Sequence, residues 1–251
     1  MKMLVKLMAA ALALLLFMVK NASGHTMKRQ TIKIQTAHPF EPFELLFIAD
    51  VHRRMIPEFA LPLAVDAVLI GGDFAEKGVP FKRIEANLKN LAKIGPVFFV
   101  WGNNDREVSE SKLRKLLAKY GVTVLDNKGV PLFGNSHLKL VGVDFFPTEE
   151  VDFDKAFKNV GKEDAVIFVS HTPFVFKRVK KEYRADFLLA GHTHGGQIRF
   201  GRFGIYKKGT LIRKNGTLQL VTNGYGTTKV PLRLGTKAEF HLLSIRPDRK
   251  R

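Results

Sequence analysis

The chain has 251 residues, of which 45% are hydrophobic and 25% charged, as is typical of a globular rather than a disordered protein. It contains no cysteine. This excludes disulfide bonds and thiolate metal sites, so any metal must be held by nitrogen and oxygen ligands. The formal net charge is +18, and residues 201–251 hold 12 basic against two acidic residues. Such a field favours anionic partners (lipid headgroups, nucleic acid or phosphorylated substrates), with a solvated basic surface as the alternative.

The N-terminal region is apolar. Leu7–Val19 is an unbroken run of 13 apolar residues, preceded by two lysines. This pattern predicts either a cleaved secretory signal peptide or a retained membrane anchor. A third interpretation is that Met27 is the true start of the protein. Basic residues on both sides of the run leave the topology open. We expect residues 1–26 to be a leader and residues 27–251 to form the folded domain of an exported or membrane-associated protein.

From residue 30 onward, apolar runs alternate with helical patterns. Residues 31–37 alternate with a period of two and predict a half-buried strand. Further strands are predicted at residues 44–50, 67–73, 96–105, 122–126, 138–144, 165–171 and 185–192, and in the C-terminal part at 197–202, 216–224 and 238–245. Helices are predicted at 81–95 and, with a serine cap, at 109–121. No linker or repeat interrupts residues 30–245, so we expect one α/β domain.

Five of the predicted strands end in side chains that can bind a metal. The apolar runs lead in chain order into IADVH, GGD, GNND, SHTP and GHTHGG. These segments contain Asp50, His52, Asp73, Asn103, Asn104, Asp105, His171, His192 and His194. Strand ends at one edge of an α/β sheet converge, and residues at i and i+2 point to one side of an extended chain. One such residue alone is more often a turn former or a buried core residue. Five segments in order indicate a metal or phosphate site.

The order D-x-H, G-D, G-N-x-D, H and G-H-x-H over residues 44–197 resembles that of the calcineurin-like metallophosphoesterases. The resemblance implies an α/β fold with four layers, an α/β/β/α sandwich of two mixed β-sheets. It also implies two divalent metal ions, and these donor types suit Mn, Fe or Zn. One ion would be bound by Asp50, His52 and His194, the other by Asn103, His171 and His192, and Asp73 would bridge both. The segments HTHGGQ and 223–235 resemble a branch that often carries an N-terminal anchor or export signal.

The resemblance further implies a phosphohydrolase. Two cations about 3.5–4 Å apart would activate a bridging hydroxide for in-line attack on phosphorus. The catalytic candidates are Asn104 and Asp105. The family usually has histidine in place of Asn104, and an amide can donate a hydrogen bond but cannot supply a proton. General acid catalysis is typically worth about 10²–10⁴-fold, so its absence should matter least for good leaving groups. We therefore expect phosphodiester or pyrophosphate substrates rather than simple monoesters.

Other candidates lie around this set. The candidates for substrate contact are Arg53, Arg54, Gln197 and Asn223, with solvated surface charge as the alternative for the arginines. Segments 176–184 and 199–208 mix basic and aromatic residues and could hold an anionic membrane surface or a nucleic-acid backbone. Two alternatives to a phosphohydrolase of small substrates stay open. A nuclease of the same superfamily is favoured by the charge and opposed by the leader, and a non-catalytic metal-binding membrane protein is suggested by Asn104.

Overall fold

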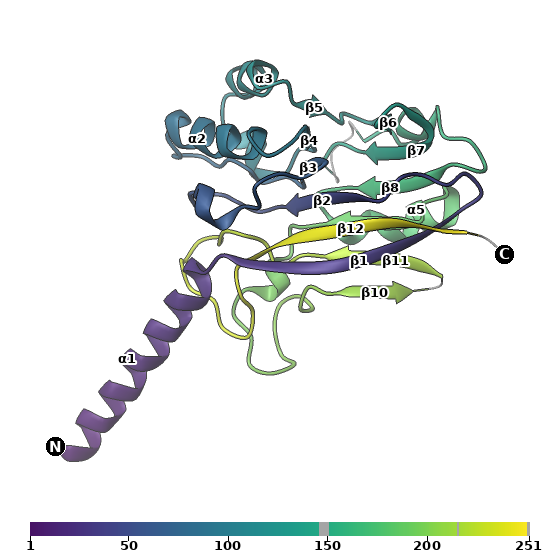
Figure 1. Ribbon diagram of the computed structural model, residues 1–251. Coiled ribbons are helices and arrows are strands. Elements are labelled where there is room, and N and C mark those ends of the chain that lie inside the picture. Colours follow the sequence, from purple (N-terminus) through teal and green to yellow (C-terminus); the bar gives the residue numbers. More distant parts are fainter. Residues whose placement is uncertain (146–150, 215, 250–251) are drawn as a thin grey trace.

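Two six-stranded mixed sheets pack face to face between outer layers of helices in a computed structural model, which describes residues 1–145, 151–214 and 216–249 (Figure 1). The first sheet has the order β1-β12-β2-β3-β4-β5. Its strands are β1 (Thr26–Thr36), β2 (Phe43–Ile48), β3 (Ala67–Ile70), β4 (Val97–Phe99), β5 (Thr123–Val124) and β12 (Glu239–Arg249). Strands β2 to β5 are parallel, and β12 runs antiparallel to β2. The predicted four-layer α/β sandwich is confirmed.

The second sheet has the order β10-β11-β9-β8-β7-β6. Its strands are β6 (Lys128–Leu132), β7 (Asn135–Gly142), β8 (Ala165–Val169), β9 (Phe187–Ala190), β10 (Leu211–Lys214) and β11 (Thr217–Val221). The four inner strands are parallel, and the edge strands β6 and β10 run antiparallel to their neighbours. The ends of β7, β8 and β9 therefore lie at one edge, as do those of the parallel strands of the first sheet.

Three apolar clusters hold the layers together. The cluster between the sheets contains Leu45 and Phe47 of β2, while the alternate residues Leu46 and Ile48 face the helices on the outer side. Because both faces of these strands are buried, their sequences are continuous apolar runs. The outer helices are α2 (Phe81–Ala92) and α3 (Glu110–Lys119) on the first sheet, and α4 (Phe153–Phe157) and α5 (Phe176–Glu182) on the second.

Several local predictions differ from the structure. Residues 197–202 are not a strand; this stretch follows the turn η4 (His194–Gly196) and forms only isolated bridges. Ser109 stands at the N-cap of α3, but its side chain makes no capping bond. The basic segment 176–184 begins with α5, whose apolar residues Phe176 and Val179 are buried on the sheet. One local prediction agrees with the structure: the connection between β2 and β3 contains only the short turn η1 (Glu58–Ala60), as expected for a segment with two prolines.

The apolar N-terminal run forms α1 (Lys2–Ser23), which projects away from the sandwich (Figure 1). At about 1.5 Å per residue, 22 residues reach about 33 Å, enough for the hydrocarbon core of a bilayer. By length and composition α1 qualifies as a membrane-crossing helix, and an N-terminal signal sequence would meet the same criteria. Only its C-terminal end, from Phe17 onward, contacts the domain, and Asn21 and Ala22 are buried there.

Candidate metal centre

The segments predicted to carry metal ligands converge at the carboxyl edge of both sheets. Asp50 and His52 follow β2, Asp73 follows β3, and Asn103 follows β4 by four residues. His171 follows β8, and His192 and His194 follow β9. The first sheet thus contributes carboxylates, an amide and one imidazole, and the second sheet contributes three imidazoles. All seven side chains meet in the space between the sheet ends.

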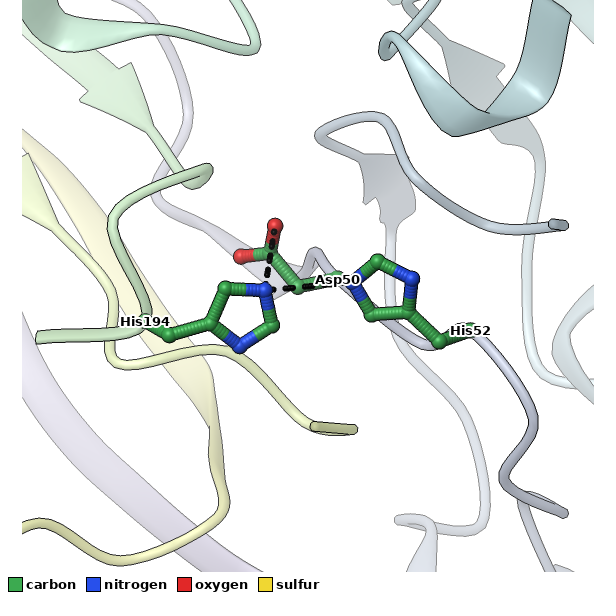
Figure 2. A group of neighbouring side chains, drawn as sticks. All are labelled: Asp50, His52 and His194. Carbon is green, nitrogen blue, oxygen red and sulfur yellow. Dashed lines mark hydrogen bonds and ion pairs between the residues drawn. The ribbon is translucent and has the colours of Figure 1, made fainter. Parts of the chain in front are cut away.

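Asp50, His52 and His194 form one compact group, shown in Figure 2. The Nε2 atoms of His52 and His194 lie 3.1 Å apart, and His194 Nε2 lies 3.6 Å from Asp50 Oδ1. All three side chains are buried. Two imidazole nitrogens and a carboxylate oxygen that face one another at this spacing leave a position from which one cation can contact all three.

Asp73, His171 and His192 form the second group. His171 Nε2 lies 3.2 Å from Asp73 Oδ2 and 3.2 Å from His192 Nδ1. Asn103 adds its amide oxygen, 3.1 Å from His192 Nδ1. Asp73 Oδ2 also lies 3.8 Å from His52 Nε2 in the first group. Asp73 is therefore the residue that connects the two groups, the position in which a bridging ligand is expected.

Backbone and carboxylate partners orient two of the imidazoles. His171 Nδ1 donates to Gly71 O at 2.9 Å, which leaves Nε2 directed at Asp73. His52 Nδ1 lies 2.9 Å from Glu76 Oε2 and donates to it, which leaves Nε2 directed at His194. A carboxylate behind a ligating histidine is a recurring feature of metal sites because it fixes the tautomer and the ring orientation. Sequence reasoning missed Glu76, although its place three residues after Asp73 could have suggested it.

The electrostatics of the centre favour a bound cation. Burial raises the pKa of Asp50. Burial also acts to raise the pKa of Asp73, but the charge and hydrogen bond of His171 outweigh it and hold that pKa at about 2. The pKa of His171 reaches about 9, because the attraction of Asp73 and Asp50 exceeds the opposing effect of burial. His192 has its pKa lowered to about 4 by burial and by the charge of His171. The carboxylates thus hold positive charge at the centre.

The donor set fits divalent metal ions. In each of the two groups, three ligand atoms lie within 4.8 Å of one another. Carboxylate, amide and imidazole donors without thiolates match the preferences of Mn, Fe and Zn. Metal binding requires neutral imidazoles, and burial favours the neutral form of His192 and His194. Burial acts to lower the pKa values of His52 and His171 too, but the neighbouring carboxylates raise both, so metal binding would release a proton from these two rings.

The two catalytic candidates lie in different environments. Asn104 begins the turn η2 (Asn104–Glu107), and its amide nitrogen lies 3.1 Å from His52 Nδ1, at the rim of the first group. Asp105 is fully buried and accepts hydrogen bonds from the backbone nitrogens of Ala75 and Gly102, at 2.8 and 2.9 Å. Its carboxylate therefore holds together the two turns that carry Asp73 and Asn103. This geometry makes Asp105 a positioning residue.

The four residues predicted to contact substrate all have hydrogen-bond partners within the chain. Arg53 pairs with Glu76. Arg54 donates to Ser23 O and Gly24 O at the end of α1. Gln197 donates to Thr228 O and Val230 O, at 3.0 Å each. Asn223 is buried and donates to Glu239. These contacts position the loops around the centre, and contact with substrate stays a prediction for all four residues.

Arg233 is a buried residue next to the centre that sequence reasoning missed. Its guanidinium is fully buried and donates to the carbonyl oxygens of Asn223 and Gly226, at 2.6 Å each. It also donates to His194 O at 3.3 Å. Arg233 therefore ties the turn that carries His194 to the loop that follows β11. Its segment belongs to the 223–235 motif, but nothing in the sequence marks this arginine as buried.

Residues 43–196 match the calcineurin-like phosphoesterase family. The match covers more than half of the chain, and its boundaries contain every residue of the two metal-binding groups. The chain belongs to the calcineurin-like phosphoesterases, a family that uses dinuclear metal sites.

Among the relatives, the uncharacterized protein YpbG of Bacillus subtilis is 42% identical over 246 residues, which cover 95% of each chain. An uncharacterized metallophosphoesterase of Helicobacter pylori strain J99 is 31% identical over 194 residues, covering 73% of this chain and 52% of that protein. The phosphodiesterase YaeI of Escherichia coli is 31% identical over 174 residues, covering 63% of each chain. This chain is thus similar to YpbG over nearly its full length.

Proposed function

We propose that this protein is a metal-dependent phosphohydrolase that cleaves phosphodiester or pyrophosphate bonds and is held at a membrane by α1. The observation that carries the proposal is the convergence of seven side chains from both sheets on two adjoining groups of ligand atoms. Asp50, His52 and His194 would hold one divalent ion, and Asn103, His171 and His192 the other, with Asp73 between them. When bound, two ions supply a hydroxide nucleophile and neutralise charge on the phosphate.

The preference for diesters or pyrophosphates rests on Asn104. Its side chain lies at the rim of the first group, where it can donate a hydrogen bond to a phosphoryl or leaving oxygen. An amide cannot release a proton at neutral pH, so the leaving group must depart without protonation by this residue. Aryl oxides and phosphate groups tolerate this best, because they are stable as anions. The similarity to the phosphodiesterase YaeI points in the same direction.

Retention at a membrane rests on the last turn of α1. Asn21 O accepts a hydrogen bond from the backbone of Ala238 at 2.9 Å, and Met18 O accepts one from Arg233 at 3.1 Å. Arg54 adds bonds to Ser23 O and Gly24 O. Cleavage after residue 22 would remove the contacts of Met18 and Asn21, and cleavage after residue 24 would remove all four contacts, whereas a retained helix keeps them. We therefore favour an anchor over a cleaved signal peptide.

The test compares bis(p-nitrophenyl) phosphate with p-nitrophenyl phosphate, with Mn²⁺ added to the metal-free full-length protein. We expect turnover of both, with a higher kcat/KM for the diester. The variant Asp73→Ala should abolish turnover, while Asp248→Ala, an exposed carboxylate at the far end of β12, should leave it unchanged. A clear preference for the monoester would contradict the proposed bond type. Equal activity of Asp73→Ala and the unmodified protein would contradict the proposed centre.

A nuclease of the same family is the second candidate, favoured by the net charge of +18. It would also hydrolyse bis(p-nitrophenyl) phosphate, so single-stranded and double-stranded DNA and RNA are tested beside it. Turnover of a nucleic acid with a kcat/KM far above that of the small diester would select this candidate.

A further inference from the structure

A cavity of about 290 Å³ adjoins the metal centre on the side of the second sheet, and we call it the lateral cavity. It lies between the turn η3 (Pro173–Val175), the segment 206–208 and the hairpin β10–β11. Phe174 lines the cavity, and its ring centroid lies 5.9 Å from that of His192. Thr193, which stands between the two histidines of the centre, also lines it. Phe174 and Thr193 therefore place the lateral cavity next to the metal centre.

The lateral cavity has an apolar side formed by Pro173, Phe174, Tyr206, Ile212 and Val221. Among its polar lining residues, Gln219 is 7% exposed, and within the described part of the chain its Nε2 finds no hydrogen-bond partner. It lies opposite Ile212 in the β10–β11 register. A buried donor without a partner destabilises the folded state. An occupant that offers an oxygen acceptor to Gln219 would remove this effect.

Positive charge lies at the same cavity. Lys207 and Lys208 line it, and an adjoining groove adds Lys180 and Lys214 beside Gln219. Apolar walls, one unpaired donor and flanking ammonium groups together match an amphiphile that carries a long apolar chain and a negatively charged phosphate. A fully polar substrate would leave the apolar side of the cavity without contact.

Two features of the surroundings identify a membrane as the source of this amphiphile. Phe200, Phe203 and Ile205, just before the cavity segment, are 70%, 68% and 87% exposed. Adjacent exposed aromatic and aliphatic side chains among basic residues are typical of surfaces that insert into a bilayer interface. Lys208 also lines a separate groove of about 260 Å³, of which Phe17 of α1 forms part. The lateral cavity therefore lies next to the helix that would enter the membrane.

We propose that the lateral cavity binds the apolar chain of a membrane lipid phosphoester whose phosphorus lies at the metal centre, with Gln219 donating to an ester or phosphate oxygen. This inference rests on the proposed function and narrows its substrate class to lipid-linked phosphodiesters or pyrophosphates. It also assigns the exposed segment 200–206 to contact with the bilayer beside α1.

The test uses two diesters that differ only in one chain, methyl 4-nitrophenyl phosphate and hexadecyl 4-nitrophenyl phosphate, with the full-length protein in lipid nanodiscs and Mn²⁺. We expect kcat/KM for the hexadecyl ester to exceed that for the methyl ester at least tenfold. Ile212→Glu places a charge in the cavity wall and should lower kcat/KM tenfold for the hexadecyl ester only. The control Leu63→Glu adds the same charge at a fully exposed position and should change neither value.

Gln219→Leu separates a ligand-binding role from a structural one. Replacing an unpaired buried donor by an apolar side chain should leave Tm unchanged or raise it, while KM for the hexadecyl ester rises about fivefold. A fall in Tm with both esters equally affected would show a structural role and overturn this assignment. Equal effects of Ile212→Glu on both esters, or none on either, would overturn the cavity proposal.

Failure of the proposed function has a different signature, namely that neither ester is hydrolysed by the unmodified protein. In that case, calorimetric titration of the full-length protein with hexadecyl phosphate and with methyl phosphate decides the cavity proposal. Binding of hexadecyl phosphate alone, lost in Ile212→Glu and kept in Leu63→Glu, would support it. Equal binding of both phosphates, or binding that Ile212→Glu leaves intact, would overturn it.

Discussion

Asp50, His52, Asp73, His192 and His194 all have φ between 48° and 69°, a region that residues other than glycine rarely adopt. They are five of the nine such residues within the described part of the chain. Each costs about 1–3 kcal/mol and persists only when the surroundings fix it. Here the backbone nitrogen of His52 donates to Asp73 O, and that of His192 donates to the Asp50 carboxylate. The strain turns these five side chains, which follow the ends of β2, β3 and β9, toward one point.

Gly72 shows how close the packing is behind these residues. It has a φ of 86°, and a Cβ atom there would lie 2.6 Å from His171 Nδ1 and 2.9 Å from Gly102 N. The substitution Gly72→Ala would therefore push the ring of His171 away from Asp73. The glycine of this motif is therefore required by the approach of an imidazole, in addition to its backbone conformation.

Glu76 gives a residue-scale prediction. Its carboxylate accepts from His52 Nδ1, so Glu76→Gln should loosen the tautomer and orientation of His52 without removing a ligand. We expect the Mn²⁺ affinity of the metal-free protein to fall about 10–100-fold, the usual effect of removing a partner behind a ligand. Titration calorimetry measures it. Glu85→Gln, which removes an exposed pair with Lys119, is the matched control. An affinity equal to that of the control would rule out this role for Glu76.

At the scale of elements, the last turn of α1 is a structural part of the domain. Its carbonyl oxygens are bonded by Arg233, Ala238 and Arg54, three residues from separate loops. Arg233 in turn holds the backbone of His194. Arg233 thus connects the apolar helix directly to the metal centre. The position of α1 and the shape of the centre therefore depend on each other.

Two truncations test this dependence. Removing residues 2–24 deletes the bonded turn, and the loss of about four hydrogen bonds should cost about 3 kcal/mol. Tm should fall by roughly 6–12 °C for a domain of this size. Removing residues 2–14 deletes only exposed helix and should leave Tm unchanged. Differential scanning calorimetry in detergent compares the three proteins. Equal Tm values for the two truncated chains would show that the last turn does not stabilise the domain.

The ends of the elements were more predictable than the contacts between them. Asp73 and His171 could be assigned to strand ends because an apolar run precedes each of them directly. The role of Arg233 could not be predicted, because its carbonyl partner on His194 is 39 residues away in the sequence. A single arginine in a loop is normally interpreted as surface charge. Asn21 and Arg233 are 212 residues apart, so no local pattern predicts that the leader joins the domain. Both contacts depend on long-range packing, which the local sequence pattern does not contain.

At the scale of the whole molecule, the metal centre joins the two sheets. Asp50, Asp73 and Asn103 belong to the first sheet, whereas His171 and His192 belong to the second. Away from this edge the sheets are held together by apolar side chains such as Phe47 and Ile167. At the edge the contacts are polar, with buried carboxylates and imidazoles facing one another. Bound cations would offset the repulsion between these carboxylates and connect both halves of the fold.

Metal binding should therefore stabilise the entire domain. A ligand at one hundred times its Kd adds about 2.7 kcal/mol for each site that binds only the folded state. For a domain of this size we expect Mn²⁺ to raise Tm by roughly 5–10 °C for each occupied site. In Asp73→Asn the rise should fall to half or less, because the residue connects both groups. The rise is compared within each protein, since loss of a buried charge also changes the metal-free Tm. An equal rise in Asp73→Asn and the unmodified protein would mean that Mn²⁺ binds elsewhere and that the two sheets are not joined by it.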